Sequence, residues 1–216
     1  MDTWGTDETG SFYLPQKLEY GTYYLREVKA PEGYLLNTED IQFKVIAERD
    51  WENPLVVACE DVPAMGKIHL KKTDKESEEA LAGAVFNVIA AENITTPDGT
   101  LQAAKAEVVT TLTTGSDGTA TSTALHFGKY KLVETKAPNG YVTSEKNWDV
   151  TLSYADQETE IVTKDVSVTN TPNEVKIKKV AADSQEALAG VEFQVWKKGT
   201  SAKDNLFDLY YADKPL

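Results

Sequence analysis

The chain is poor in the side chains that metal sites, disulfides and catalytic triads require. It has one cysteine and two histidines among its 216 residues. The single cysteine, Cys59, excludes an internal disulfide and is typical of a small apolar core residue. His69 and His126 are too few to supply a zinc site or a Ser/His/Asp triad. We therefore expect no metal, no cofactor and no enzymatic turnover of an external substrate.

Basic residues are also scarce, with 22 lysines and arginines against 35 aspartates and glutamates and a net charge of -13. Nucleic acid and anionic membrane surfaces are recognised through basic patches, so neither is expected as a partner. No apolar run approaches the roughly 18 residues that a membrane-spanning helix needs. The opening segment MDTWGTDETG lacks a signal-peptide pattern, and the closing segment LYYADKPL lacks an anchor. For a surface protein, both targeting signals would lie outside this piece.

What the chain does contain favours β-strands and a repeated unit. Tyrosine, tryptophan, threonine and valine, which suit strands, are frequent. Residues 66–88 and 173–195 share an alternating stretch, a Lys-Lys pair and the motif EALAG. Residues 23–34 and 129–141 share a strand pattern with one glutamate, followed by Ala-Pro-x-Gly-Tyr. Self-similarity of this kind indicates tandem copies of one domain.

The order of these motifs divides the chain into one complete unit and two partial units. Residues 66–172 form the complete unit, whose length is typical of a domain. Residues 1–63 match the C-terminal half of such a unit, and residues 174–216 match the N-terminal half of another. Pro63 and Pro172 mark corresponding boundaries, because proline ends a strand and stiffens a linker.

Alternating apolar residues predict a series of short strands in the complete unit. The turn motifs PDG, GSDG and APNG separate them, and Asp98 and Asp117 are expected to be plain turn residues instead of calcium ligands. Each strand should bury one face. We therefore expect an all-β fold of tandem Ig-like β-sandwich domains. The predicted strands lie near residues 67–72, 84–90, 106–113, 119–124, 129–135, 146–153 and 160–170.

The remaining segments carry weaker patterns. Residues 90–106 include LQAAKAEV and are expected to form a surface insertion with a helical turn. Alternation also predicts strands in both partial units. These lie at residues 11–15, 21–28, 41–48 and 54–62 in the first, and at 175–180, 190–199 and 206–212 in the last.

Four spaced motifs carry a resemblance to a known family. They are LKKTD at residues 70–74, LAGAVFNV at 81–88, YKLVETKAPNGY at 130–141 and VSVTNTP at 166–172. In this order they resemble the Cna-B-type domain (SpaA-like, with a prealbumin-like fold) of Gram-positive surface adhesins and pilins. The resemblance covers the complete unit from end to end and extends into both partial units.

The resemblance implies a covalent bond between side chains. In the Cna-B family, a lysine of the first strand and an asparagine or aspartate of the last strand join in a spontaneous isopeptide bond, and a glutamate assists. By position, the resemblance assigns the lysine to Lys72, the assisting acid to Glu134 and the acceptor to Asn170.

The residue pattern itself agrees with these assignments. Lys72 alternates with Ile68 and Leu70 and therefore shares their inward face, whereas Lys71 points outward. Glu134 lies on the inward face of its own strand by the same argument. A buried lysine is unfavourable unless it is paired or neutral, and burial favours the uncharged form of an amine and of a carboxyl.

An uncharged pair has the chemistry that an amide bond requires. A neutral Lys72 amine is a nucleophile, and a protonated Glu134 carboxyl can polarise the Asn170 side-chain carbonyl and relay protons. Contact between the groups supplies the effective concentration that a slow reaction needs. The alternative is a buried Lys72–Glu134 ion pair, with Asn170 ending its strand by bonding to the turn.

The partial units repeat some of these residues. Glu27 matches Glu134, and Asp61 matches Asn170, so a bond to Asp61 would release water instead of ammonia. Lys179 matches Lys72, although KKVAAD departs from KKTD just after the lysine. A bond among Lys179, Glu27 and Asp61 requires the two partial units to pair, within one chain or between chains.

These observations predict a structural protein whose chemistry is directed at itself. We expect a wall-associated stalk or pilin-like array on the surface of a Gram-positive bacterium, with a single-turnover cross-link in each domain. The expected partners are neighbouring repeats, other pilin subunits or a host extracellular matrix protein. The alternatives are an adhesin module that binds a host ligand and an accessory domain of a larger secreted enzyme.

Overall fold

The structure is a computed structural model that describes residues 3–15, 17–46 and 52–195. The chain divides into two compact units, Met1–Asn173 and Glu174–Leu216. The described residues form strands, turns and extended segments without a helix, which confirms the all-β class. Within the same residues, no helix is long and apolar enough to cross a membrane.

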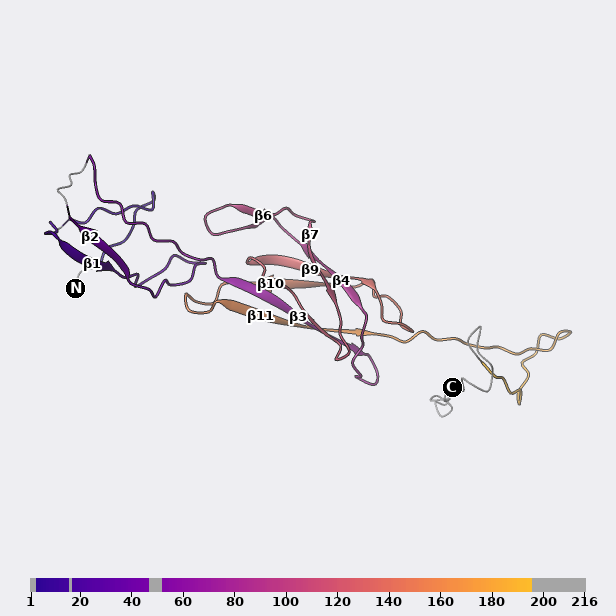
Figure 1. Ribbon diagram of the computed structural model, residues 1–216. Coiled ribbons are helices and arrows are strands. Elements are labelled where there is room, and N and C mark those ends of the chain that lie inside the picture. The colour runs from indigo at the N-terminus through magenta and orange to yellow at the C-terminus, as the bar shows by residue number, and fades with distance from the viewer. Residues whose placement is uncertain (1–2, 16, 47–51, 196–216) are drawn as a thin grey trace. The chain divides into compact units, whose positions relative to one another are not determined.

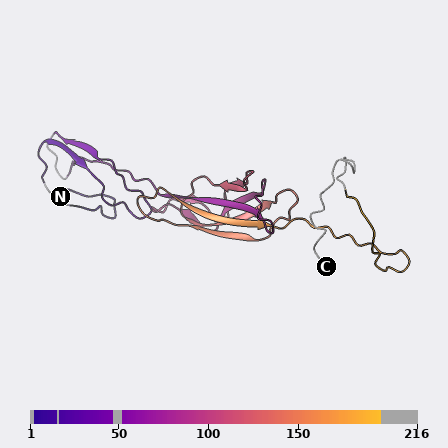
Figure 2. The same cartoon turned by 90° about the horizontal axis from the view of Figure 1, so that it is seen from below.

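The centre of the first unit is a β-sandwich of two sheets (Figure 1). Neighbouring strands are antiparallel except for one pair, β11 and β3, which run parallel over their whole length (Figure 2). The four-stranded sheet has the order β10 (Asn147–Leu152), β9 (Gly128–Lys136), β4 (Val85–Ala90) and β7 (Val108–Thr113). The three-stranded sheet has the order β11 (Ile161–Asn170), β3 (Met65–Asp74) and β8 (Thr119–Thr121).

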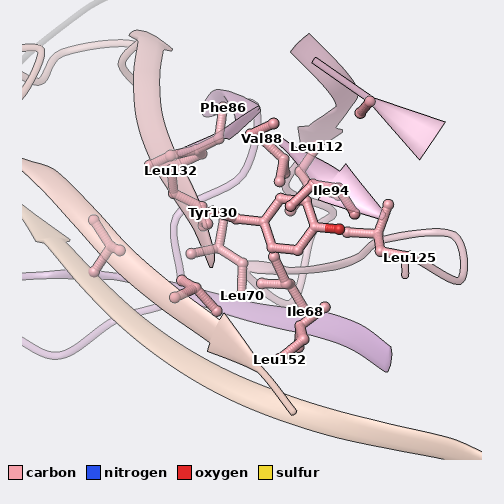
Figure 3. Packing of buried hydrophobic residues seen from close by; sticks show 14 of the residues in the cluster. Ile68, Leu70, Phe86, Val88, Ile94, Leu112, Leu125, Tyr130, Leu132 and Leu152 are labelled. Carbon is pink, nitrogen blue, oxygen red and sulfur yellow. The ribbon is translucent and has the colours of Figure 1, made fainter. Parts of the chain in front are cut away.

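Side chains from both sheets interdigitate between the layers. The Tyr130 ring lies among the labelled aliphatic side chains of β3, β4 and β7 (Figure 3), and its hydroxyl donates to the His126 carbonyl at 2.5 Å. Ile68, Leu70 and Leu132 are fully buried, in agreement with the predicted alternation. All of the strands predicted in residues 66–172 are present, because each has one apolar face to bury against the other sheet.

Residues 90–106 differ from the prediction of a surface insertion with a helical turn. They form a short hairpin of β5 (Ile94–Thr95) and β6 (Leu101–Ala103). Ile94 and Ala103 are buried in the main core. A hairpin allows these two apolar side chains to reach the sandwich from a segment too short to gain a stable helix.

The N-terminal part contains a two-stranded sheet of β1 (Gly21–Leu25) and β2 (Ile41–Val45). The strands predicted at 11–15 and 54–62 are absent, since no strand among the described residues pairs with these segments. The strand predicted at 175–180 and the described part of 190–199 are likewise not strands. The prediction for residues 206–212 lies outside the described residues.

Hydrogen bonds join the loop after β1 to the sandwich. The side chain of Gln157 accepts from the Ala30 backbone N–H at 3.1 Å, and its carbonyl accepts from Leu36 at 2.9 Å. The Tyr154 hydroxyl donates to the Tyr34 carbonyl at 3.3 Å. The Ala-Pro-Glu-Gly-Tyr loop is therefore docked against residues 154–157 of the complete unit.

Candidate cross-linking site

Lys72 projects into the sandwich near the end of β3, where it lies between two other buried residues, Leu70 and Asp74. Its side chain is fully buried, as are those of Ile68 and Leu70, while the neighbouring Lys71 is exposed. Strand periodicity places these side chains alternately inside and outside, so the predicted orientation of both lysines is confirmed. The local sequence thus forces an amine into an apolar layer.

The backbone of Lys72 is clamped on both sides. Its N–H donates to the Gly118 carbonyl at 2.7 Å, and its own carbonyl accepts from Leu81 at 3.0 Å. Gly118 adopts a left-handed φ of 72°, and a Cβ at that position would lie 2.5 Å from the Lys72 carbonyl oxygen. The GSDG turn therefore needs glycine here to approach the strand that carries the amine.

Replacement of Gly118 by alanine should move the Lys72 backbone and slow the cross-linking that the family resemblance predicts for this site. The left-handed conformation alone costs an alanine about 1 to 2 kcal/mol, and the contact with the Lys72 carbonyl adds to that cost. Thermal unfolding and intact mass measure the two effects. Gly99→Ala is the matched control, because Gly99 has a φ of 87° and a Cβ added there would meet nothing within 4 Å. Equal effects of the two substitutions would contradict the proposed clamp.

Glu134 lies near Lys72 on the facing sheet, and Asn170 lies on β11, the strand that pairs with β3. Glu134 lies on β9 and Asn170 ends β11, and their side chains are 4% and 3% exposed. The Asn170 amide Nδ2 donates to Glu134 Oε2 at 2.9 Å and to the Val142 carbonyl at 2.7 Å. Glu134 Oε2 also accepts from the Ser144 backbone N–H at 2.7 Å. These contacts hold the carboxyl and the amide in fixed orientations.

Two polar atoms of this cluster have no hydrogen-bond partner. They are Glu134 Oε1 and Asn170 Oδ1, which are both buried. The Lys72 amine donates to the Val168 carbonyl at 3.5 Å, and the ion pairs that the described residues form are elsewhere. A buried acceptor without a donor costs about 1 to 3 kcal/mol. Because two oxygens are unpaired and Lys72 makes no ion pair with Glu134 in the described part of the chain, the site does not contain a formed buried ion pair.

Burial lowers the pKa of the Lys72 amine to about 8. Loss of hydration is the largest cause, and the nearby carboxyls of Glu134 and Asp74 oppose it. An ordinary lysine is almost entirely protonated near neutral pH, whereas about a tenth of this amine is neutral at pH 7, and the neutral fraction rises steeply above that pH. Lys72 is therefore prepared to act as a nucleophile.

Asp74 is a buried member of the site that the sequence analysis missed. Its carboxylate accepts from the backbone N–H groups of Glu76 at 2.7 Å and Ser77 at 2.8 Å. These bonds, together with the Tyr141 hydroxyl, hold the pKa of Asp74 below its usual range. Asp74 lies two residues after Lys72 on the same face, so the motif KKTD contained the signal. Its role is to fix the turn beside the lysine.

The residues predicted to react in the partial units belong to different compact units of the chain. Glu27 and Asp61 are half-buried in the first unit of the chain, and Lys179 is exposed in the second. Glu27 Oε2 accepts from the Asn37 backbone N–H at 2.7 Å, which repeats the bond between Glu134 and Ser144. The structure therefore brings Lys72, Glu134 and Asn170 into one cluster. In the N-terminal part, Glu27 accepts the same kind of backbone hydrogen bond as Glu134 does.

Comparisons with known proteins agree with this fold. The sequence pattern of the SpaA prealbumin-like fold domain matches residues 1–54 and 66–167. The trypsin-resistant surface T6 protein of Streptococcus pyogenes serotype M6 is 28% identical over 122 residues, which are 56% of this chain and 20% of that protein. The chain thus spans about a fifth of the length of this curated relative.

Two solved structures add to the comparison. The Bacillus anthracis TIE protein is 25% identical, with a TM-score of 0.55, over 77% of this chain and 28% of that chain. The pilus 2b backbone protein of group B streptococcus is 25% identical, with a TM-score of 0.38, over 68% of this chain and 53% of that chain.

Proposed function

Because the chain belongs to the SpaA family of prealbumin-like fold domains, we propose that it is a pilin-like structural protein whose sandwich unit closes itself with an isopeptide bond. The bond joins Lys72 to Asn170, and Glu134 relays the protons. The observation that carries this proposal is the cluster itself, in which an amine, a carboxyl and an amide are all buried and mutually oriented. Buried groups of this kind are rarely retained without a use.

The reaction is an amide exchange that needs no cofactor. The neutral Lys72 Nζ attacks Asn170 Cγ, and the protonated Glu134 carboxyl stabilises the oxygen on which negative charge develops. The Cγ–Nδ2 bond then breaks, and Nδ2 leaves as ammonia after Glu134 has transferred a proton from Nζ to it. One C–N bond replaces another, so atoms and electrons balance, and Glu134 returns to its starting state.

The geometry of the strands gives this bond a mechanical purpose. β3 and β11 are parallel neighbours, and Lys72 and Asn170 lie near their C-terminal ends. A bond between them closes a loop that contains most of the complete unit, including both sheets. Tension applied through the two ends of the unit then passes through the covalent bond, and the enclosed residues do not extend.

The wider role of the whole protein follows from the same premise. The curated relative is named as a trypsin-resistant surface protein, and a closed, cross-linked sandwich would resist proteases because it seldom opens to expose its backbone. We place this chain on the surface of a Gram-positive bacterium, among neighbouring repeats and other pilin subunits. The docking of the Ala30–Tyr34 loop on Gln157 and Tyr154 would stiffen such an array.

Intact mass of the purified protein tests the cross-link. The proposal predicts a mass below that of the sequence by one ammonia, and the full sequence mass in Lys72→Ala and in Asn170→Ala. A Lys71→Ala variant is the matched control, because Lys71 is the exposed neighbour and should leave the ammonia loss intact. A folded wild-type protein with the full sequence mass would refute the proposal.

The pH dependence of stability should differ between joined and unjoined protein. In Asn170→Ala the Lys72 amine stays free, with its pKa near 8 in the folded state against the usual 10.5. The unfolded chain then binds more protons between these values, so the free energy of unfolding rises with pH, by about 1 to 3 kcal/mol in total. In the wild type Nζ is an amide and has no such titration.

Urea unfolding at several pH values between about 8 and about 9.5 measures this difference while staying below the range in which tyrosines ionise. Stability that rises with pH in Asn170→Ala but not in the wild type is the expected result. The same slope in both proteins would show that Lys72 is free in both.

A further inference from the structure

The loop between β9 and β10 encloses the acceptor end of the site. Tyr141 forms an isolated bridge to Pro172, and the Val142 N–H donates to the Thr171 carbonyl at 3.1 Å. The Val142 carbonyl accepts from Asn170 Nδ2 at 2.7 Å. The loop therefore runs beside the chain that follows β11, and it contacts the amide that the proposed reaction consumes.

The Val142 carbonyl decides which end of the Asn170 amide faces Glu134. The two ends of an amide differ in hydrogen bonding, since the nitrogen donates and the oxygen accepts. A carbonyl can only accept, so Val142 holds Nδ2. Half a turn of the amide would place Oδ1 against this carbonyl, and two buried acceptors in contact are unfavourable. A carboxyl can also donate when it is protonated, so Glu134 does not impose the same choice.

This orientation matters because Nδ2 is the nitrogen that leaves in the proposed reaction. It lies 2.9 Å from Oε2 of Glu134, the carboxyl that has to give it a proton. In the opposite orientation the leaving nitrogen would be turned away from its proton donor, and its departure as ammonia would be slow. The position of the Val142 carbonyl therefore controls the reaction without taking part in it.

Tyr141 ties this loop to the end of β3. It is half-buried, it immediately precedes Val142, and its hydroxyl donates to the Asp74 carboxylate. The backbone N–H groups of Ser77 and Glu76, and to a smaller extent the Tyr141 hydroxyl, hold the pKa of Asp74 below its usual range. A charged acceptor makes a stronger hydrogen bond than a neutral one, so Asp74 is a firm anchor for the tyrosine.

Asp74 is itself fixed beside the acceptor. It is 4% exposed, and it lies opposite Asn170 in the register of the parallel strand pair. The Lys75 N–H donates to the Asn170 backbone carbonyl at 3.1 Å. A closed path of contacts therefore leads from the backbone of Asn170 to the end of β3, through Tyr141 to Val142, and back to the Asn170 amide.

We propose that Tyr141 is a positioning residue for the bond between Lys72 and Asn170. Its hydroxyl, anchored on Asp74, holds the Val142 carbonyl at the place where it turns the leaving nitrogen toward the proton relay. The proposal rests on the proposed function, to which it adds a task for the tyrosine that ends the motif Ala-Pro-Asn-Gly-Tyr.

The rate of ammonia loss tests the effect of Tyr141→Phe, which removes the hydroxyl and keeps the ring. The full chain, dissolved unfolded in urea with its full sequence mass, is diluted to start folding, and intact mass is followed with time. We expect ammonia loss to be slower by about tenfold to a hundredfold, because small errors in placing reacting groups cost rates of this size. Tyr154→Phe is the matched control. Tyr154 is also half-buried and donates its hydroxyl to a carbonyl, that of Tyr34, so its loss should leave the rate unchanged.

The orientation of the amide is measured in protein that cannot react. Lys72→Met fills the space of the lysine without an amine, and nuclear magnetic resonance then reports solvent exchange of the two Asn170 Nδ2 hydrogens. We expect both to be protected by their acceptors, and Tyr141→Phe to speed their exchange at least about tenfold. The backbone N–H groups of β3 and β11 should keep their protection, whereas a merely structural role of the tyrosine would loosen these strands as well.

Each outcome supports or overturns the proposal. Slower ammonia loss together with faster Asn170 exchange supports it. Slower loss with unchanged Asn170 exchange, or with loosened β3 and β11, overturns the positioning role. Ammonia loss at the wild-type rate in folded Tyr141→Phe refutes this proposal alone. A folded wild type that keeps its full sequence mass refutes the proposed function, and this proposal with it.

Discussion

Replacement of Glu134 by glutamine is expected to leave Lys72 and Asn170 unjoined in a folded protein. Glutamine fills the same space and can keep the contacts with Asn170 and Ser144. It has no carboxyl proton to relay, so the reaction stops although the amine and the amide still meet. Intact mass should then show the full sequence mass, without loss of ammonia.

The same substitution should cause a large loss of stability. Closing a loop of roughly a hundred residues stabilises a folded chain by about 4 to 5 kcal/mol, because it restricts the unfolded state. Losing the bond should therefore lower the melting temperature by about 15 °C or more. Differential scanning calorimetry of Glu134→Gln and the wild type measures the shift.

Glu92→Gln is the matched control for Glu134→Gln. Glu92 is 44% exposed and pairs with Lys129 at 3.5 Å on the surface. This substitution should change stability by no more than about 0.5 kcal/mol and leave the ammonia loss intact. Complete ammonia loss in Glu134→Gln would contradict the assigned role of Glu134.

Replacement of Phe86 by alanine is expected to have the second large effect. Phe86 is fully buried on β4, pairs in register with Glu134 on β9, and packs its ring against Trp148 at 6.0 Å. Removing a buried ring leaves a cavity and costs about 3 to 5 kcal/mol. The cavity also admits motion and water beside Glu134, so the cross-link should form slowly and incompletely.

Urea unfolding and intact mass measure both consequences of Phe86→Ala. We expect a lower unfolding midpoint and a mixture of joined and unjoined protein. Thr113→Ala is the control, because Thr113 lies exposed on β7 next to the same strand. An unchanged midpoint with a fully joined protein would mean that the core beside the site does not support the reaction.

The sequence predicted the strands of the complete unit because each of them has its own partner in that unit. Alternation plainly marks β3, β9 and β11 as strands. The structure adds which strands are neighbours, with β9 between β10 and β4, and β3 between β11 and β8. The same alternation at 54–62 predicted a strand that is absent, since a strand also requires a neighbour and, in the part of the chain that the structure describes, no strand pairs with that segment. The helical turn predicted in residues 90–106 is absent for another reason. Alanine, glutamine and lysine suit a helix, but burial of Ile94 decided the structure in favour of a hairpin.

The side chains of the site were also predictable, and their environment was not. Strand parity points Lys72 and Glu134 inward, and the resemblance to the Cna-B-type domain assigned Asn170 at the end of its strand. The carbonyl of Val142 and the N–H of Ser144 belong to a loop whose path no periodicity specifies. The clamp at Gly118 likewise joins a turn to a distant strand, which a single sequence does not show.

Peptide mapping of the denatured protein tests the central claim most directly. Trypsin cleaves after lysine, so Lys71 and Lys75 delimit one peptide when Lys72 is an amide, and Lys164 and Lys176 delimit the peptide that contains Asn170. Tandem mass spectrometry should find these two peptides as one branched species, lighter than their sum by one ammonia. Cleavage after Lys72 and a free peptide with intact Asn170, from protein that was folded before digestion, would contradict the account.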